Sequence, residues 1–228
     1  MTIRLMCLPY AGAGAGVFRP WLHRDSAVLR AVPIQVPGRE EEFTEPFYAT
    51  MAEAAAGTAE RIRAAAGTEP FVVFGHSFGA TLAYEATHHL MATGGPVPDH
   101  LVVSGAVSPR HRQAEALDGD DEEVAAQAAA IAGRPIAAFA DPALRAILLP
   151  AMRADVNLLA GYAPSTLSPL PMPLTAVRGE ADHLAPAAEW LDWSTFTSGA
   201  FRTVQFGGGH MYLTEQWSEL WKTLEELV

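Results

Sequence analysis

The sequence contains one cysteine and few positive charges, and each shortage excludes a class of structure or partner. Cys7 has no second cysteine with which to pair, which excludes an internal disulfide and is usual in a reducing compartment. Fifteen Lys and Arg against 26 Asp and Glu give a formal net charge of −11. Because phosphate groups are bound by clustered cations, we expect neither nucleic acid nor an anionic membrane surface as partner.

Long hydrophobic runs are absent as well. No stretch approaches the ~18 uninterrupted apolar residues of a membrane span, and Pro9 interrupts the N-terminal apolar residues before a signal-peptide core is complete. We therefore expect a cytoplasmic protein. Half of the residues are hydrophobic and only 18% are charged, which favours a substantial core and excludes global disorder. From the length we expect residues 1–228 to form a single domain.

Short apolar runs without helical periodicity alternate with amphipathic helical patterns. The runs that predict buried strands are 3–9, 31–38, 69–75, 100–106, 172–179 and 201–207. The helical patterns lie at 46–66, 78–93, 141–162 and 212–227. This alternation predicts an α/β fold with a mostly parallel central sheet and helices on both faces. In such folds reactive groups collect on loops at the carboxyl ends of the strands.

Residues 108–164 interrupt the alternation, because they are apolar and helical with no strand signal. Acidic residues open one helical pattern that closes at Gly133, and Asp141-Pro142 has the form of an N-cap followed by proline at the first helical position. We interpret the segment as a helical lid inserted between the fourth and fifth strands. A helical pair packed elsewhere on the sheet is the alternative.

A candidate nucleophile lies in FVVFGHSFGATLAYEA (71–86), where a strand pattern turns into a helical one at the G-x-S-x-G of residues 75–79. A serine on so tight a turn has a strained backbone, and larger side chains in place of the glycines would collide. The turn exposes the hydroxyl of Ser77 beside the free N–H groups of the helix that follows. The alternative is that Ser77 only caps the helix that begins at Phe78.

A serine hydroxyl needs a base to take its proton and an acid to orient that base. His210 is our candidate base, because it follows the last strand behind three glycines and precedes a C-terminal helix; a loop histidine that caps the helix is the alternative. Asp182, in the loop after the fifth strand, is the candidate acid, with Glu180 as the alternative. Asp155, within the lid helix, is interpreted as a solvated or salt-bridged residue.

Acyl chemistry also needs backbone N–H donors for the developing oxyanion. The amide of Phe78, directly after the nucleophile, is one candidate. The other is the amide of Ala11, next to Tyr10, in the loop LPYAGAGAGVF after the first strand, whose small residues permit close approach. A phosphate-binding loop is the alternative, but the G-x-G-x-x-G spacing and the P-loop lysine are both missing.

Taken together, the motifs CLPYAGAGAG, VPGRE, FGHSFGA, ADPALRAILLPAMRADVNLLAGY, RGEADHLAP and GGGHMYL resemble those of one family, and they occur in that family's order across nearly the whole chain. The family is the stand-alone type II thioesterases of polyketide and nonribosomal peptide pathways, which have the α/β-hydrolase fold. The resemblance implies hydrolysis of acyl groups from the phosphopantetheine arm of an acyl or peptidyl carrier protein. This sequence differs from the family in the first loop, where the family's sequence is usually closer to A-G-G-S-A.

On this hypothesis no metal or cofactor is required, and nothing suggests more than a monomer. Residues expected to contact substrate are Tyr10, Leu148, Met152, Leu158 and Leu159, and those expected to dock the acidic carrier are Arg110, His111 and Arg112. Three alternatives remain: an acyl-transferring or cyclising enzyme, a generic carboxylesterase, and a binding module without catalysis.

Overall fold

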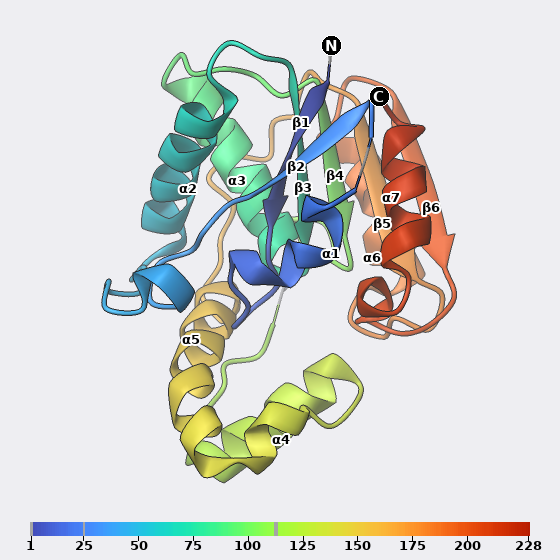
Figure 1. Cartoon of the computed structure of the whole chain (residues 1–228). Coiled ribbons are helices and arrows are strands. Elements are labelled where there is room, and N and C mark those ends of the chain that lie inside the picture. The colour runs from blue at the N-terminus through green and yellow to red at the C-terminus, as the bar shows by residue number, and fades with distance from the viewer. Residues whose placement is uncertain (1, 25, 112–113) are drawn as a thin grey trace.

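The fold is built on one parallel sheet. The structure, a computed structural model, describes residues 2–24, 26–111 and 114–228. Six strands pair in the order β2-β1-β3-β4-β5-β6, and every pairing between them is parallel (Figure 1). The strands are β1 (Ile3–Leu8), β2 (Leu29–Pro33), β3 (Phe71–His76), β4 (His100–Ser104), β5 (Leu174–Gly179) and β6 (Phe201–Phe206). The predicted parallel α/β architecture is therefore confirmed.

Helices cover both faces of this sheet. The α-helices are α1 (Arg19–Leu22), α2 (Met51–Ala66), α3 (Phe78–Ala92), α4 (Asp121–Ala132), α5 (Pro142–Ala160), α6 (Ala187–Leu191) and α7 (Trp217–Glu225). Short 3-10 turns are η1 (Ala15–Phe18), η2 (Glu40–Glu42), η3 (Ala137–Ala140), η4 (Asp192–Phe196) and η5 (Tyr212–Thr214).

Alternation along β3 shows how the two faces are filled. Phe71 and Val73 belong to a core cluster shared with α2 and α3, whereas Val72 and Phe74 belong to a second cluster with α1 and α7. Successive strand side chains point to opposite faces, so a continuous apolar run is what a strand covered on both sides requires. Cys7 of β1 is fully buried in the second cluster, and burial raises the pKa of its thiol.

The strand order fixes where a site can form. From β1 the chain runs to the edge strand β2 and then returns to β3 on the other side of β1. The order thus reverses between β1 and β3, and a crevice opens at the carboxyl ends of strands at such a switch point. Leu8 pairs with Gly75 there, so the loop after β1 lies directly beside the turn after β3.

Some element bounds differ from the predicted ones. The second strand is Leu29–Pro33 and ends before residue 38, since its pairing with β1 stops at Pro33. α2 begins at Met51 instead of residue 46, because the Thr50 side chain accepts from the Glu53 amide and caps the helix.

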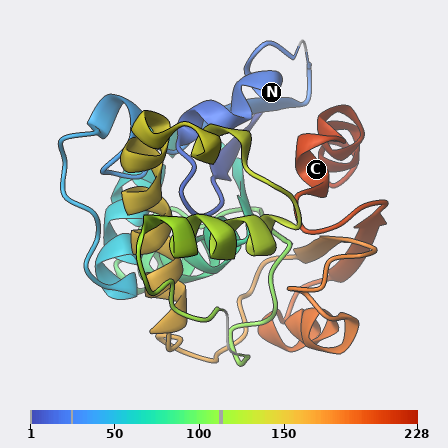
Figure 2. The same cartoon turned by 90° about the horizontal axis from the view of Figure 1, so that it is seen from below.

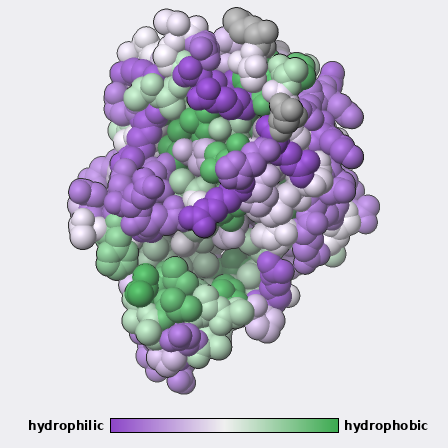
Figure 3. All heavy atoms as spheres, in the orientation of Figure 1, coloured by the Kyte–Doolittle hydropathy of each residue, from purple (hydrophilic) through white to green (hydrophobic). Residues whose placement is uncertain are grey.

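Segment 108–164 contains α4, η3 and α5. Asp120 and Glu123 form a capping box at the start of α4, and Gly133 ends it at φ +69°. The two helices lie beyond the carboxyl ends of the strands (Figure 1), and the view from below has them in front of the sheet (Figure 2). Hydrophobic side chains gather on the surface of this part of the molecule (Figure 3), and Leu144 and Ile147 of α5 are among those exposed.

Across the described ranges, no helix combines the length and the hydropathy that crossing a bilayer demands.

We expect the free energy of unfolding to fall as the pH drops below about 6.5, because buried His100 of β4 is neutral in the folded chain. Its Nε2 lies 2.9 Å from Thr175 Oγ1, and burial, with a smaller effect from Arg202, lowers its pKa to about 4. The unfolded histidine has an ordinary pKa near 6.5, so it takes up a proton first and acid favours unfolding between pH 6.5 and 4. One such group contributes at most about 1.4 kcal/mol per pH unit.

Urea denaturation followed by tryptophan fluorescence from pH 4 to 8 measures this dependence. His100→Asn should reduce this slope relative to that of the wild-type chain. An unchanged slope in His100→Asn would contradict the assignment.

Candidate active site

The turn between β3 and α3 carries Ser77 in a strained conformation. Its φ of +54° and ψ of −118° lie outside the regions that side chains usually occupy, and its hydroxyl makes no capping hydrogen bond. The alternative that Ser77 merely caps the helix is therefore wrong. A Cβ on Gly75 would lie 2.0 Å from the Gly79 carbonyl oxygen, and one on Gly79 would lie 2.3 Å from the Leu8 carbonyl oxygen. Both glycines of the motif are sterically required.

His210 and Asp182 converge on this turn from two neighbouring loops. His210 Nε2 lies 3.0 Å from Ser77 Oγ, and its Nδ1 lies 3.1 Å from each carboxylate oxygen of Asp182. Both side chains are buried, whereas Glu180, the alternative acid, is exposed. The nucleophile, base and acid predicted from the sequence are thus brought together in the geometry of a Ser–His–Asp triad.

Small residues allow the two loops to meet. Asp182 follows β5 and His210 follows β6, and these strands are paired along their length. The Ala181 amide donates to the Gly208 carbonyl at 2.9 Å. A Cβ on Gly179 would lie 2.3 Å from the Gly209 carbonyl oxygen, so a larger residue there would push the loops apart.

The electrostatics of the pair favour an ionised acid. Burial by itself raises the pKa of Asp182, but the hydrogen bond and charge of His210 and the amide of Leu184 outweigh burial. The net result is a pKa below the ordinary carboxyl value. Asp182 therefore stays charged wherever the protein is folded near neutral pH.

Two amides beside Ser77 have no hydrogen-bond acceptor assigned within the described chain, those of Phe78 and Ala11. Phe78 begins α3, and its amide is one of the unpaired donors of that helix N-terminus. In the loop after β1, the Gly12 amide donates to Asp155 Oδ2 at 2.8 Å and the Ala13 amide to the Tyr10 carbonyl at 3.0 Å. Of these three loop amides, the Ala11 N–H alone is left for a ligand.

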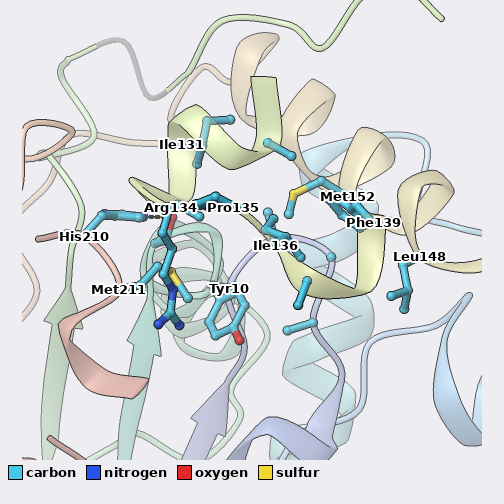
Figure 4. Close-up of a pocket in the computed structure, with 17 residues that line it drawn as sticks. Tyr10, Ile131, Arg134, Pro135, Ile136, Phe139, Leu148, Met152, His210 and Met211 are labelled. Carbon is cyan, nitrogen blue, oxygen red and sulfur yellow. Dashed lines mark hydrogen bonds between the residues drawn. The ribbon is translucent and has the colours of Figure 1, made fainter. Parts of the chain in front are cut away.

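Two cavities meet at the nucleophile. The larger, of about 450 Å³, and the smaller, of about 280 Å³, both reach Ser77, His210 and Ala11. Figure 4 shows the larger one, with Tyr10 and Arg134 on one side and Phe139, Leu148 and Met152 of the insertion on the other. The smaller is lined mostly by apolar side chains, among them Val107, Val156 and Leu159.

The sequence-predicted contact residues divide between these cavities. Tyr10, Leu148 and Met152 line the larger one and Leu159 the smaller, whereas half-buried Leu158 packs against the main core cluster and lines neither.

Two of the expected carrier-docking residues, Arg110 and His111, line neither cavity. Arg110 pairs with Asp192 at 3.5 Å and stacks over Phe196, and His111 Nε2 lies 3.4 Å from Asp192. Arg112, the third docking residue, lies outside the described residues.

Sequence reasoning missed a polar chain behind the base. His76 Nδ1 lies 2.8 Å from Ser104 Oγ, which in turn lies 2.6 Å from the Tyr212 hydroxyl. The His76 ring is 5.1 Å from that of His210, and burial, with the nearby His210, lowers the pKa of His76 well below its ordinary value. His76 is consequently neutral at pH 7 and adds no positive charge beside the base. Its place inside G-H-S-F-G was the only available signal.

Among the described residues, no group of three or more His, Cys, Asp or Glu could hold a metal ion.

The fold and the strand–serine–helix turn define a member of the α/β-hydrolase class. Residues 3–228 match the family model described as Thioesterase domain, and the chain belongs to the thioesterase family. The resemblance to type II thioesterases, and with it an enzyme that acts on thioesters, is confirmed by the relatives and solved structures that follow.

Two curated relatives are similar along almost the whole chain. Thioesterase PikA5 of Streptomyces venezuelae is 33% identical, and the alignment covers 96% of this chain and 78% of PikA5. The gramicidin S biosynthesis protein GrsT of Aneurinibacillus migulanus is 30% identical, with 96% of this chain and 86% of GrsT covered.

Two solved structures have the same fold. The RedJ thioesterase from the prodiginine biosynthetic pathway in Streptomyces coelicolor aligns with a TM-score of 0.89 at 31% identity, covering 99% of this chain and 90% of RedJ. The type II thioesterase BorB from the borrelidin biosynthetic cluster aligns with a TM-score of 0.87 at 29% identity, covering 99% and 92%.

Asp182→Asn should lower kcat for an acyl thioester by about 10⁴-fold, since the asparagine favours the wrong tautomer of His210 while leaving the geometry intact. Steady-state kinetics with a thiol-trapping reagent measures the loss. Glu180→Gln is the matched control, and we expect it to retain wild-type kcat; a larger loss in that variant would exchange the roles of the two acids.

Proposed function

We propose that this chain is a type II thioesterase that hydrolyses acyl groups from the phosphopantetheine arm of acyl or peptidyl carrier proteins, for editing or release in polyketide or nonribosomal peptide synthesis. The observation that carries the proposal is the 3.0 Å contact between His210 Nε2 and Ser77 Oγ, with Asp182 on the other ring nitrogen. The biosynthetic pathways in which GrsT, RedJ and BorB take part support the substrate class.

Acylation starts with proton transfer within the triad. His210 Nε2 takes the hydroxyl proton of Ser77 as Oγ attacks the thioester carbonyl carbon, and Asp182 stabilises the imidazolium that forms. The amides of Ala11 and Phe78 donate to the oxyanion. The C–S bond then breaks, His210 gives its proton to the departing sulfur, and an ester to Ser77 remains.

Deacylation repeats the sequence with water. His210 removes a proton from a water molecule as its oxygen attacks the ester carbonyl, and the same two amides bind the second oxyanion. Collapse breaks the bond to Oγ, which regains its proton from His210. The products are a carboxylic acid and the free thiol of the arm, and no cofactor enters the balance.

The two cavities suit the two halves of such a substrate. The pantetheine arm occupies the larger cavity, where the half-exposed guanidinium of Arg134, which also contacts Thr214 Oγ1 at 2.9 Å and Glu215 Oε1 at 3.5 Å, meets a phosphodiester. The acyl chain occupies the smaller, mostly apolar one. In this proposal residues 1–228 form one domain, and the insertion 108–164 acts as a lid over both cavities.

Carrier docking by Arg110 and His111 stays a prediction, and both side chains contact Asp192, at 3.5 and 3.4 Å. With a net charge of −11, long-range attraction to an acidic carrier is absent, so the encounter is expected to be weak and transient.

Labelling with a fluorophosphonate probe tests the nucleophile. The wild-type chain should be labelled and Ser77→Ala should not, and the same variant should lose roughly 10⁶-fold in kcat on an acyl-carrier thioester. Retained turnover in Ser77→Ala would refute the proposal, and labelling without any hydrolase activity would favour a binding module.

The remaining alternatives differ in their products. Intact-protein and product mass spectrometry with an acyl-carrier substrate distinguishes a free acid from a cyclised or transferred acyl group. A higher kcat/KM for oxygen esters than for matched thioesters would indicate a carboxylesterase.

Filling one cavity at a time tests how the substrate is divided. Leu159→Trp should lower kcat/KM for long acyl-carrier thioesters by at least about tenfold while sparing acetyl thioesters, because the added ring occupies the smaller cavity. Leu148→Trp, in the larger cavity, should instead impair all carrier-bound substrates alike. If kcat/KM depended on acyl-chain length in Leu148→Trp and not in Leu159→Trp, the acyl chain would occupy the larger cavity and the arm the smaller.

A further inference from the structure

A buried ion pair joins three segments that surround the nucleophile. Arg39, in the loop after β2, makes a two-pronged contact with Asp155 of α5, one prong being the 2.9 Å bond from Nη2 to Oδ1. Both residues are almost fully buried, with exposed fractions of 6% and 2%. The third segment is the loop after β1, since Asp155 Oδ2 also accepts from the Gly12 amide at 2.8 Å.

The ion pair and a turn within the loop together hold the peptide planes on both sides of Ala11. Asp155 holds the N–H of the Ala11–Gly12 peptide. The Tyr10 carbonyl accepts from the Ala13 amide, and Arg39 Nη1 donates to the Ala13 carbonyl at 3.2 Å. In a trans peptide the N–H points opposite to the C=O, so a fixed Tyr10 carbonyl also fixes the direction of the Ala11 N–H.

Close packing couples this loop to the helix. Gly12 has φ +77°, and a Cβ on it would lie 3.0 Å from Met152 Cβ and 3.1 Å from Met152 Cα. The loop therefore lies directly on the backbone of α5, and no side chain intervenes that a rotamer change could move. A shift of α5 would carry Asp155 and the Gly12 amide with it.

Stability alone is a poor reason for such a pair. Removing two charges from water costs several kcal/mol per ion, and apolar residues of similar volume often serve as well or better. Burial raises the pKa of Asp155, and the Arg39 guanidinium and the Gly12 amide oppose that shift. An apolar replacement would fill the space but would leave the Gly12 amide without its acceptor.

We propose that the Arg39–Asp155 ion pair is a positioning device for the oxyanion-binding loop, holding the Ala11 N–H towards Ser77 only while α5 is docked. Neither residue touches the reacting atoms, so both act through the loop. The position of the inserted helix thereby decides whether the second oxyanion donor is in place. This inference rests on the proposed function, because it assumes that Ala11 serves acyl transfer at Ser77.

The decisive variant replaces both charges. Arg39→Met with Asp155→Leu keeps the volume and removes the acceptor, so the melting temperature should stay within a few degrees of wild type. We expect kcat to fall about 10- to 100-fold, less than the 10²- to 10³-fold cost of deleting an oxyanion donor outright, while KM changes less than about twofold. The rate constant for fluorophosphonate labelling should fall in parallel, since phosphonylation uses the same donors.

Asp155→Asn provides a graded second variant, because its amide oxygen still accepts from Gly12 although the charge is lost. We expect kcat values in the order wild type, Asp155→Asn, double variant, whatever the order of melting temperatures. All rates are divided by the fraction of chains that the fluorophosphonate finally labels, which corrects for unfolded protein.

Arg61 and Glu42 supply the control, because they form an equally two-pronged pair, with both contacts at 2.6 Å, away from the loop. Arg61→Gln with Glu42→Gln should leave kcat unchanged. A folded Arg39/Asp155 double variant with wild-type kcat, or a loss confined to melting temperature in both Asp155 variants, would overturn the inference. Turnover surviving in Ser77→Ala would instead overturn the proposed function, so the two failures are distinguishable.

Discussion

The hydrogen bond between His210 and Ser77 joins residues 133 positions apart, and it depends on the alignment of strands in a parallel sheet. In such a sheet every strand ends at the same edge, so loops distant in sequence become neighbours there. β1 beside β3 places the oxyanion loop next to the serine, and β5 beside β6 places the acid next to the base. A slip of one residue in either pairing would turn the side chains to the opposite face and separate these groups.

Small residues allow the segments that the sheet aligns to come into contact. Gly79 lies against the backbone of the loop after β1, Gly179 against that of the histidine loop, and Gly12 against α5. At Gly79 and Gly179 backbone meets backbone, and the first carbon of any side chain would overlap a carbonyl oxygen; at Gly12 it would make a tight contact of 3.0 Å with Met152 Cβ. Glycine at these positions is therefore a geometric requirement of the site, in addition to any effect on chain flexibility.

Much of the fold could be predicted because its signals are local. Apolar runs indicate the buried strands, capping residues indicate where α4 and α5 begin, and the serine turn has a fixed five-residue spacing. The predicted bounds of an element were wrong where tertiary contacts decide where it ends, as for β2 at Pro33. The triad could be predicted because chain order and loop position restrict each choice to a few residues.

What escaped prediction depends on pairing between distant side chains. Arg39 and Asp155 are 116 residues apart, and nothing near either one specifies the other; Asp155 alone suggested a solvated or paired surface position. Similarly, His76 gains its partners only once β4 and the segment after β6 lie beside it. A buried polar residue needs a partner, but only the folded chain identifies that partner.

The complete burial of Cys7 in β1 has a practical consequence. Thiolates, not thiols, react with alkylating reagents, and this thiol is both protonated and inaccessible in the folded protein. A cysteine introduced on the surface of α4 or α5 would accordingly be the sole target for a spectroscopic label, without altering the native residue at position 7. Motion of the inserted helices relative to the sheet thus becomes observable in the otherwise unmodified chain.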